Sequence, residues 1–237
     1  MEYHRTEDGQ IQADMARRLG IVLKQYCNLV SNGEKYEVTL SLSILQTLLT
    51  NCIELLNRLD KRDKKENPLF KTPIDSELWG ILESNILLNS FLTNQINVDF
   101  VIRHIRNALS HPTKVNSEIQ LQTTGYSTIQ TGSNIIENIY FVSSPDLNGR
   151  GKRKDHSLEK AKDLLKDGTF PAGVEIEQLP NNRHAFTLNK KPFFRIFKIT
   201  FTPRQIAQLA FGLSNYLSQP LNVKWDGKTF IINKLAA

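Results

Sequence analysis

The first half of the chain repeats apolar residues at steps of three and four, which is the spacing of one face of a helix. This spacing predicts four helices along residues 1–116. Asp75 or Ser76 can cap the third of them, and Asn97 or Asp99 can begin the fourth. Helices with short connections favour an antiparallel bundle. The apolar positions are, helix by helix, Ile11, Met15, Leu19, Val22, Tyr26 and Leu29; Leu45, Leu48, Leu49, Cys52, Leu56 and Leu59; Leu78, Ile81, Leu82 and Ile86; Val98, Val101, Ile102, Ile105 and Leu109.

The pattern changes after Pro112, where strand-like segments outnumber helical ones. Alternation or β-branched and aromatic residues predict strands over residues 119–122, 135–142, 174–179 and 193–201. Helices are expected over residues 157–166 and from Pro203 to Leu217, because proline suits the first turn of a helix. The Asp-Gly pair at 226–227 predicts a hairpin between residues 221–225 and 228–232. We therefore expect an α+β fold, with an N-terminal antiparallel helical bundle over residues 1–116 and a mixed strand and helix extension over residues 117–237 packed on it.

Composition excludes several classes of protein. The chain has 237 residues, of which 40% are hydrophobic and 23% charged, as is ordinary for a globular protein. Its two cysteines are too few for a disulfide scaffold or a four-thiolate zinc site. No apolar run approaches the roughly 18 residues of a membrane span, and the polar N-terminus does not resemble a signal peptide. These features predict a soluble, cytoplasmic protein without membrane contact.

The positive charge is concentrated in the second half. Residues 1–116 hold 14 lysines and arginines against 14 acidic residues, whereas residues 117–237 hold 16 against 10. A basic half is typical of proteins that bind polyanions, since phosphates are held by many Lys and Arg contacts. The alternative is that a net charge of +6 serves solubility alone.

The fourth predicted helix carries two kinds of residue on opposite sides. Each residue of a helix is rotated by about 100° from the one before it, and with this rotation the apolar residues of the segment all lie on one side. The other side presents Arg103, Arg106, Asn107, Ser110 and His111, and His104 lies between the two faces. Pro112 disfavours helical geometry for the residue before it, so His111 is expected at the helix end. One ordinary amphipathic helix would thus offer guanidiniums, an amide and an imidazole together.

The segment from Arg106 to His111 resembles the Arg-Asn-x-x-x-His form of the motif of HEPN domains. A shuffled chain of this composition would contain that pattern roughly 0.02 times. HEPN domains are small helical bundles, commonly dimeric, found in RNA-cutting toxins, CRISPR-associated effectors and antiviral defence proteins. The resemblance implies a HEPN-like bundle over residues 1–116 and leaves residues 117–237 unassigned. The alternative is structural: Arg106 pairs with a carboxylate, while Asn107 and His111 finish the helix.

The resemblance also implies a chemistry, namely metal-independent RNA cleavage by attack of the 2′-OH on the adjacent phosphate, with no cofactor. His111 would transfer protons, Arg106 would hold the charge on the phosphoryl oxygens, and Asn107 would assist. A homodimer would bring two motifs into one cleft, and the products would carry 2′,3′-cyclic phosphate. A toxin–antitoxin or antiviral role with a regulatory or antitoxin partner is compatible with it. The other hypotheses are a HEPN-like module that binds RNA or protein without cutting, and a purely structural helical protein.

Further residues are weaker candidates. Arg103 and Lys114 adjoin the motif and are candidate contacts to the RNA backbone, although Arg103 can equally have a surface or interface role, whereas His104 is expected to be a packed or capping histidine. A second group, Arg150, Lys152, Arg153 and Lys154, is either an RNA-gripping arm or a solvated loop. The aromatic residues Phe193, Phe194 and Phe197, beside Arg195 and Lys198, suggest a stacking platform for bases, but a strand core explains them better. His156 and Glu159 have helical spacing for a metal ion but no further ligand, so no metal site is expected.

Overall fold

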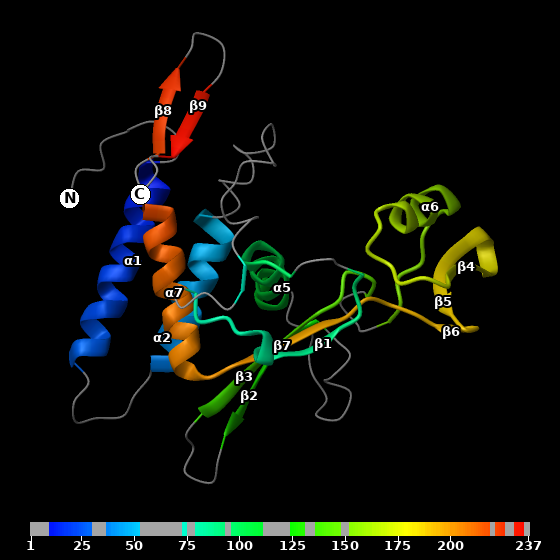
Figure 1. The fold of residues 1–237 in the computed structure, drawn as a ribbon, viewed down its shortest axis with the longest axis horizontal. Helices are drawn as coiled ribbons and strands as arrows, with labels where there is room; N and C mark the ends of the chain where they lie inside the picture. The colour runs from blue at the N-terminus through cyan, green and yellow to red at the C-terminus, as the bar shows by residue number, and fades with distance from the viewer. Residues whose placement is uncertain are drawn as a thin grey trace. The chain divides into compact units, whose positions relative to one another are not determined.

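The computed structural model describes residues 10–29, 37–52, 73–74, 79–92, 96–110, 124–130, 136–147, 152–218, 221–225 and 230–234 (Figure 1). The chain divides into two compact units that alternate along the sequence. The first comprises residues 1–68, 76–81 and 203–237, and the second comprises residues 69–75 and 82–202. Each unit therefore contains segments that are far apart in the sequence.

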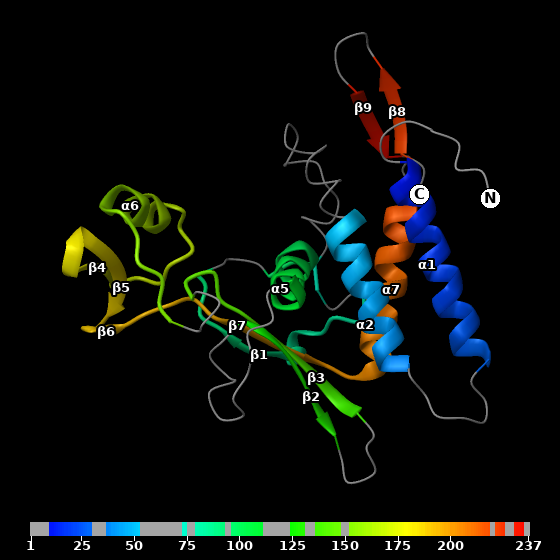
Figure 2. The ribbon, with the colours of Figure 1, turned by 180° about the vertical axis from the view of Figure 1, so that it is seen from behind.

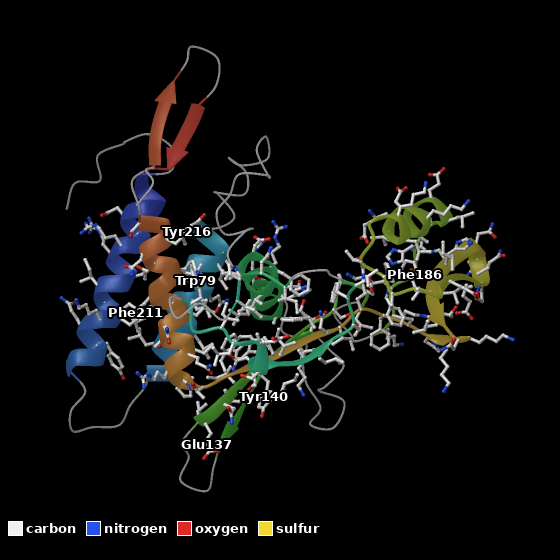
Figure 3. All side chains as sticks on the ribbon, viewed as in Figure 1. Trp79, Glu137, Tyr140, Phe186, Phe211 and Tyr216 are labelled. Atoms are coloured by element: carbon white, nitrogen blue, oxygen red, sulfur yellow. The ribbon has the colours of Figure 1, made fainter. Side chains whose placement is uncertain are left out.

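The first unit is built on three helices, α1 (Gln10–Leu29), α2 (Glu37–Thr47) and α7 (Pro203–Ser218), with a π-helical turn at Leu48–Cys52 that continues α2. Figure 2 shows the three helices side by side. Trp79 is almost fully buried in this unit, and its ring meets that of Tyr216 edge to face at 5.9 Å (Figure 3). The same unit contains a hairpin of β8 (Leu221–Trp225) and β9 (Phe230–Lys234).

Small residues set the close packing of α1 on α7. The Ser214 hydroxyl of α7 donates to the Ala16 carbonyl of α1 at 2.6 Å. A side chain on Gly20 would place its Cβ only 2.1 Å from the Ser214 hydroxyl oxygen. Ala16 and Leu23 are fully buried, whereas Val22, on the predicted apolar face, is 47% exposed. The sequence pattern therefore misplaced the buried face of this helix, because it ignored the small residues that let two helices approach closely.

The second unit contains a four-stranded antiparallel sheet in the order β1-β7-β3-β2. Its strands are β1 (Ile86–Asn89), β2 (Gly125–Gln130), β3 (Ile136–Ser143) and β7 (Phe197–Phe201). The helix α5 (Val98–Ser110) packs against β3 and β2 on one face of the sheet (Figure 1). The core of this unit lies between the helix and that face.

A smaller layer lies in the same unit. The helix α6 (Leu158–Lys166) begins at Ser157, whose side chain accepts a hydrogen bond from the Lys160 amide. It packs on a three-stranded sheet of β4 (Val174–Leu179), β5 (Arg183–Leu188) and β6 (Lys191–Pro192), with a 3-10 turn at Pro180–Asn182. Ala161, Phe170 and Phe186 form its small core.

A buried ion pair joins these two parts of the second unit. Arg195 and Asp146 are each 5% exposed. The guanidinium of Arg195 donates to both carboxylate oxygens of Asp146 at 2.9 and 2.8 Å, and the Arg195 backbone amide donates to the same carboxylate at 2.8 Å. The remaining nitrogen of the guanidinium bonds to Asp167 at 3.3 Å and to the Thr169 hydroxyl. The guanidinium also lies 4.0 Å from the centre of the Phe170 ring.

The expected arrangement of a helical bundle over residues 1–116 followed by an extension is wrong, although the α+β class holds. The fourth predicted helix packs on a sheet, and the C-terminal helix α7 packs with α1 and α2. Helical periodicity identifies the face that will be buried but not the element that buries it. The apolar face of α5 suits a sheet as well as it suits other helices.

The third predicted helix is also wrong in its described part. Residues Glu83–Asn85 form a single 3-10 turn, and Ile86–Asn89 form β1. The side-chain oxygen of Asn85 accepts a hydrogen bond from the Leu82 amide at 2.8 Å, which stabilises a turn in place of a helix. Short apolar runs are compatible with either structure, and pairing with β7 decides this one.

Most other elements are confirmed where the structure describes them: α1, α6, α7, β3, β4 and the hairpin of β8 and β9. The strand expected over residues 193–201 is confirmed only at Phe197–Phe201. The second predicted helix is confirmed as far as Cys52. Its remainder and the strand at residues 119–122 lie outside the described residues.

Breaking the buried ion pair is expected to destabilise the fold strongly. Asp146→Asn leaves the Arg195 guanidinium buried without its main counter-charge, so the free energy of unfolding should fall by about 3–5 kcal/mol in urea titrations. Asp155→Asn is the matched control, because Asp155 pairs with Arg183 at 2.8 Å on the surface and should change stability little. Equal stability of the two variants would contradict the structural importance of the buried pair.

Candidate active site on helix α5

Helix α5 begins where the sequence predicts. The side-chain oxygen of Asn97 accepts a hydrogen bond from the Phe100 amide at 2.9 Å, which caps the helix. Asp99 in the first turn pairs with Arg103 one turn later at 2.7 Å. Burial raises the pKa of the Asp99 carboxyl, and the Arg103 charge opposes this effect. Local sequence thus defines the start of the helix that carries the motif.

The predicted core face of α5 is confirmed. Its apolar residues are all at most 4% exposed, and they pack on the sheet beside Ile139 and Phe141 of β3. Because the apolar face of α5 is fixed by packing on the sheet, the other residues of the helix must lie at the edge of that face or on the outer side of the helix. The buried residues of α5 are Val98, Val101, Ile102, Ile105, Ala108 and Leu109.

The motif residues lie on the remaining surface. Arg106 and Asn107 are partly buried, Ser110 is exposed, and Arg103 has 49% of its side chain exposed. Helix α5 ends at Ser110, the residue immediately before His111. His111 and Lys114 lie outside the described residues. The structure therefore locates Arg106 and Asn107 at the last turn of the helix, directly before the histidine in the sequence.

Asn107 is anchored to the sheet. Its side-chain amide donates to the Ser143 hydroxyl oxygen at 2.8 Å, and the same oxygen lies 2.9 Å from Nδ1 of His104. Ser143 is 1% exposed at the end of β3. An asparagine side chain has two N–H donors and one carbonyl acceptor, so the contact with Ser143 uses one of its two donors. The contact fixes the orientation of Asn107 without using all of its hydrogen-bonding capacity.

His104 is enclosed by aromatic rings. The centres of the Phe91, Phe100 and Phe197 rings lie 4.8, 4.4 and 4.9 Å from that of His104. Burial lowers the pKa of His104 to about 4, and the charges of Arg195 and Arg103 add to this effect. At neutral pH the imidazole is uncharged. The expectation of a packed histidine is confirmed.

The basic segment is held by the small sheet. Arg153 donates to the Phe186 carbonyl at 3.0 Å and to Glu177 at 3.1 Å. The Lys154 ammonium donates to the Pro145 carbonyl at 2.6 Å, whereas Lys152 is exposed. Arg150 lies outside the described residues. Arg153 and Lys154 are therefore held against the small sheet and the loop after β3.

The aromatic run after β6 belongs to the core. Phe197 is 1% exposed, Phe193 packs against the cluster around Phe186, and Arg195 is buried in its ion pair. The strand-core interpretation is therefore confirmed for Phe197, whereas Phe193 and Phe194 are partly buried and lie outside the strands. His156 pairs with His184 through backbone hydrogen bonds of 2.8 and 2.9 Å. Among the described residues, no group of three or more His, Cys, Asp or Glu side chains is placed to hold a metal ion.

Two residues of this site were missed by the sequence pattern. Ser143 shares a face of β3 with Ile139 and Phe141, so alternation along the strand predicts its direction. Nothing local relates it to Asn107, which is 36 residues away in the sequence. Phe91 follows β1, a segment that the sequence pattern did not predict as a strand, and its ring contacts that of His104.

Comparisons with protein-family models, with curated proteins and with solved structures found no match for this chain. In the described part of the chain, no helix is long and apolar enough to cross a membrane. The HEPN resemblance therefore depends on the motif residues alone, and the function that it implies is a proposal.

The partly buried His104 predicts a loss of stability in mild acid. Its pKa is about 4 in the folded chain against 6.5 for a free histidine, so the unfolded chain binds more protons between these values. The contribution to stability is complete above about pH 6.5 and is lost as the pH falls toward 4. Between pH 7 and pH 5 the free energy of unfolding should fall by about 2 kcal/mol from this residue.

The measurement is urea unfolding as a function of pH, with His104→Gln as the comparison. This variant cannot titrate at that position, so its free energy of unfolding should depend less on pH by about the same 2 kcal/mol. Nuclear magnetic resonance of the wild-type ring should show no titration above about pH 5. A midpoint near 6.5 would exclude the enclosed, neutral imidazole.

Proposed function

We propose that this chain is a metal-independent endoribonuclease that acts as a homodimer, with Arg106, Asn107 and His111 as the reacting groups. The observation that carries the proposal is the Arg-Asn-x-x-x-His spacing at the end of α5. The fixed core face of that helix supports it, because it leaves Arg106 and Asn107 at the rim of the last turn. Asn107 is further oriented by Ser143.

The proposed reaction uses the substrate's own hydroxyl. A base removes the 2′-OH proton, the 2′-oxygen attacks the adjacent phosphorus, and the bond from phosphorus to the 5′-oxygen breaks. An acid returns a proton to the leaving 5′-oxygen, which gives a 2′,3′-cyclic phosphate and a 5′-OH end. Histidine suits both proton transfers near neutral pH. The planar guanidinium of Arg106 suits the charge that develops on the phosphoryl oxygens.

The dimer is part of the proposal because the reaction needs two proton carriers. The motif of one chain contains a single candidate, since His104 is neutral and enclosed by aromatic rings. Two-fold symmetry places the same residue twice around one axis. A pair of motifs around one phosphodiester would supply the base from one protomer and the acid from its partner.

A second candidate function is a HEPN-like module that binds RNA or protein without cutting it. The observation that favours this candidate is the hydrogen bond from the Asn107 amide to Ser143. An asparagine that fastens the helix to the sheet has a structural role, so its presence in the motif does not require catalysis. The two candidates differ in the fate of bound RNA.

We also propose a cytoplasmic location and a defence or toxin–antitoxin setting, in which a regulator or antitoxin controls the activity.

Replacement of the motif histidine is expected to stop cleavage. In an assay of mixed single-stranded RNA on denaturing gels, His111→Ala and Arg106→Ala should reduce the cleavage rate by at least about 100-fold, because proton transfer and charge stabilisation each contribute that much. Arg106→Lys should recover part of the loss, since it keeps the charge without the planar fork. The activity should persist in EDTA.

The matched controls are His156→Ala and Arg183→Ala, which remove the same side-chain types at positions outside the motif. Both should cut at nearly the wild-type rate, and circular dichroism should show that all five variants are folded. A His111→Ala protein that cuts RNA as fast as wild type would exclude the assignment. Bound but uncut RNA in every preparation would favour the binding module.

Mixing wild-type and His111→Ala chains tests the shared cleft. If each reaction needs a histidine from both protomers, hybrid dimers are inactive and an equal mixture keeps about a quarter of the wild-type activity. If each protomer acts alone, the mixture keeps about half. A linear dependence of the rate on the wild-type fraction would rule out the shared cleft.

A further inference from the structure

The four-stranded sheet has two faces of different character. Along β7, and along β3 from Asn138 to Phe141, buried residues alternate with partly exposed ones, as is usual for a sheet covered on one side. The buried set faces α5. By strand register, Tyr140 and Lys198 belong to the other face of the two central strands, and Figure 3 labels Tyr140. The buried set on the face of α5 is Ile139, Phe141, Ser143, Phe197, Ile199 and Phe201.

Tyr140 and Lys198 form a pair on this second face. Strand register places Thr200 opposite Tyr140 and Lys198 opposite Val142, so the lysine is the diagonal neighbour of the tyrosine. The Lys198 ammonium nitrogen lies 5.3 Å from the centre of the Tyr140 ring. Val142 is buried, which fits a lysine stem lying along it. An aromatic ring and a positive charge are thus held side by side at the centre of the sheet.

We propose that this face binds single-stranded RNA, with a base stacked at Tyr140 and the neighbouring phosphate at Lys198. Aromatic side chains on an antiparallel sheet stack unpaired bases, and a lysine supplies the charge that a phosphate needs. The excess of basic residues in residues 117–237, which contain both strands, matches a polyanionic ligand. The choice of RNA rather than DNA rests on the proposed function.

The composition of the face argues against a protein partner. Lysine is depleted from the cores of protein interfaces, and here it occupies the central strand. The neighbour of Lys198 on β1 is Leu88, which is 45% exposed and extends the surface that a flat base can cover. A flat platform with one charge is better suited to a nucleotide chain than to a folded protein surface.

The platform lies on the face of the sheet away from α5. A strand of RNA bound there would be held by contacts that read no sequence, whereas the motif at the end of α5 would act on a separate part of the strand. The platform is therefore an additional contact surface, distinct from the residues proposed to cut.

The test is binding of a fluorescent oligouridylate about twelve nucleotides long in which every 2′-OH is methylated. This probe lacks the attacking hydroxyl, so the full-length wild-type chain cannot cleave it by the proposed reaction, and binding is measured independently of activity. Fluorescence anisotropy should show that Tyr140→Leu raises the dissociation constant about tenfold, because one stacked base is lost. Tyr140→Phe keeps the ring and should bind as wild type.

The matched control is Tyr126→Leu. Tyr126 lies opposite Phe141 in the strand register, so it belongs to the face of α5, and it is 42% exposed. Its loss should leave binding unchanged. The salt dependence of binding tests Lys198, because each phosphate contact on a single strand contributes about 0.7 to the slope of log affinity against log salt concentration. Lys198→Gln should therefore make this slope shallower by about 0.7.

The outcomes separate this proposal from the proposed function. Absence of probe binding by the wild type, or equal weakening by the changes at Tyr126 and Tyr140, would overturn the platform even if RNA is cleaved. Tight, Tyr140-dependent binding without cleavage of unmodified RNA would support the platform and exclude the nuclease. Capture of a protein on this face with no effect of Tyr140→Leu on the probe would also overturn it.

Discussion

The second unit depends on one buried ion pair. Arg195 stands at the entry to β7 and Asp146 follows the end of β3, so their contact holds two neighbouring strands in register. The same guanidinium reaches the loop after α6 through Asp167 and lies over the Phe170 ring, which ties the small sheet to the large one. Two desolvated charges contribute little net stability by themselves, but loss of either partner leaves the other in an apolar core.

The ion pair also bears on the candidate site. Arg195 lies 5.5 Å from the centre of the Phe91 ring, and Phe91 contacts His104 on α5. The positive charge of Arg195 helps to keep that imidazole neutral. Neutral His104 and Asn107 then share the hydroxyl of Ser143. Helix α5 is thus positioned on the sheet by its apolar face and oriented by two polar contacts to Ser143.

Much of the local structure is predictable from the sequence, because it depends on local chemistry. Asn97 and Ser157 cap helices α5 and α6 as short polar side chains should, and Pro203 begins α7. The buried face of α5 follows from its spacing alone. These features require no knowledge of distant residues.

The errors concern contacts between distant segments. Nothing in residues 1–116 indicates that α7 packs against α1, or that β1 joins a strand more than a hundred residues away. The buried face of α1 was misjudged because Gly20 and Ala16 allow close approach while contributing little apolar area. The burial of Arg195 depends on Asp146, a partner 49 residues away that no local pattern indicates. The motif on α5 was found because it is local, whereas its supporting residue Ser143 is not.

The most direct test of the central claim is the chemistry of the RNA ends. Mass spectrometry of a defined oligonucleotide, incubated with the purified chain in EDTA, distinguishes the two routes of cleavage. Attack by the 2′-oxygen, as proposed for the motif of α5, predicts fragments that end in 2′,3′-cyclic phosphate paired with fragments that begin with a 5′-OH. Fragments with a 3′-OH and a 5′-phosphate, or intact RNA at every enzyme concentration, would contradict the account.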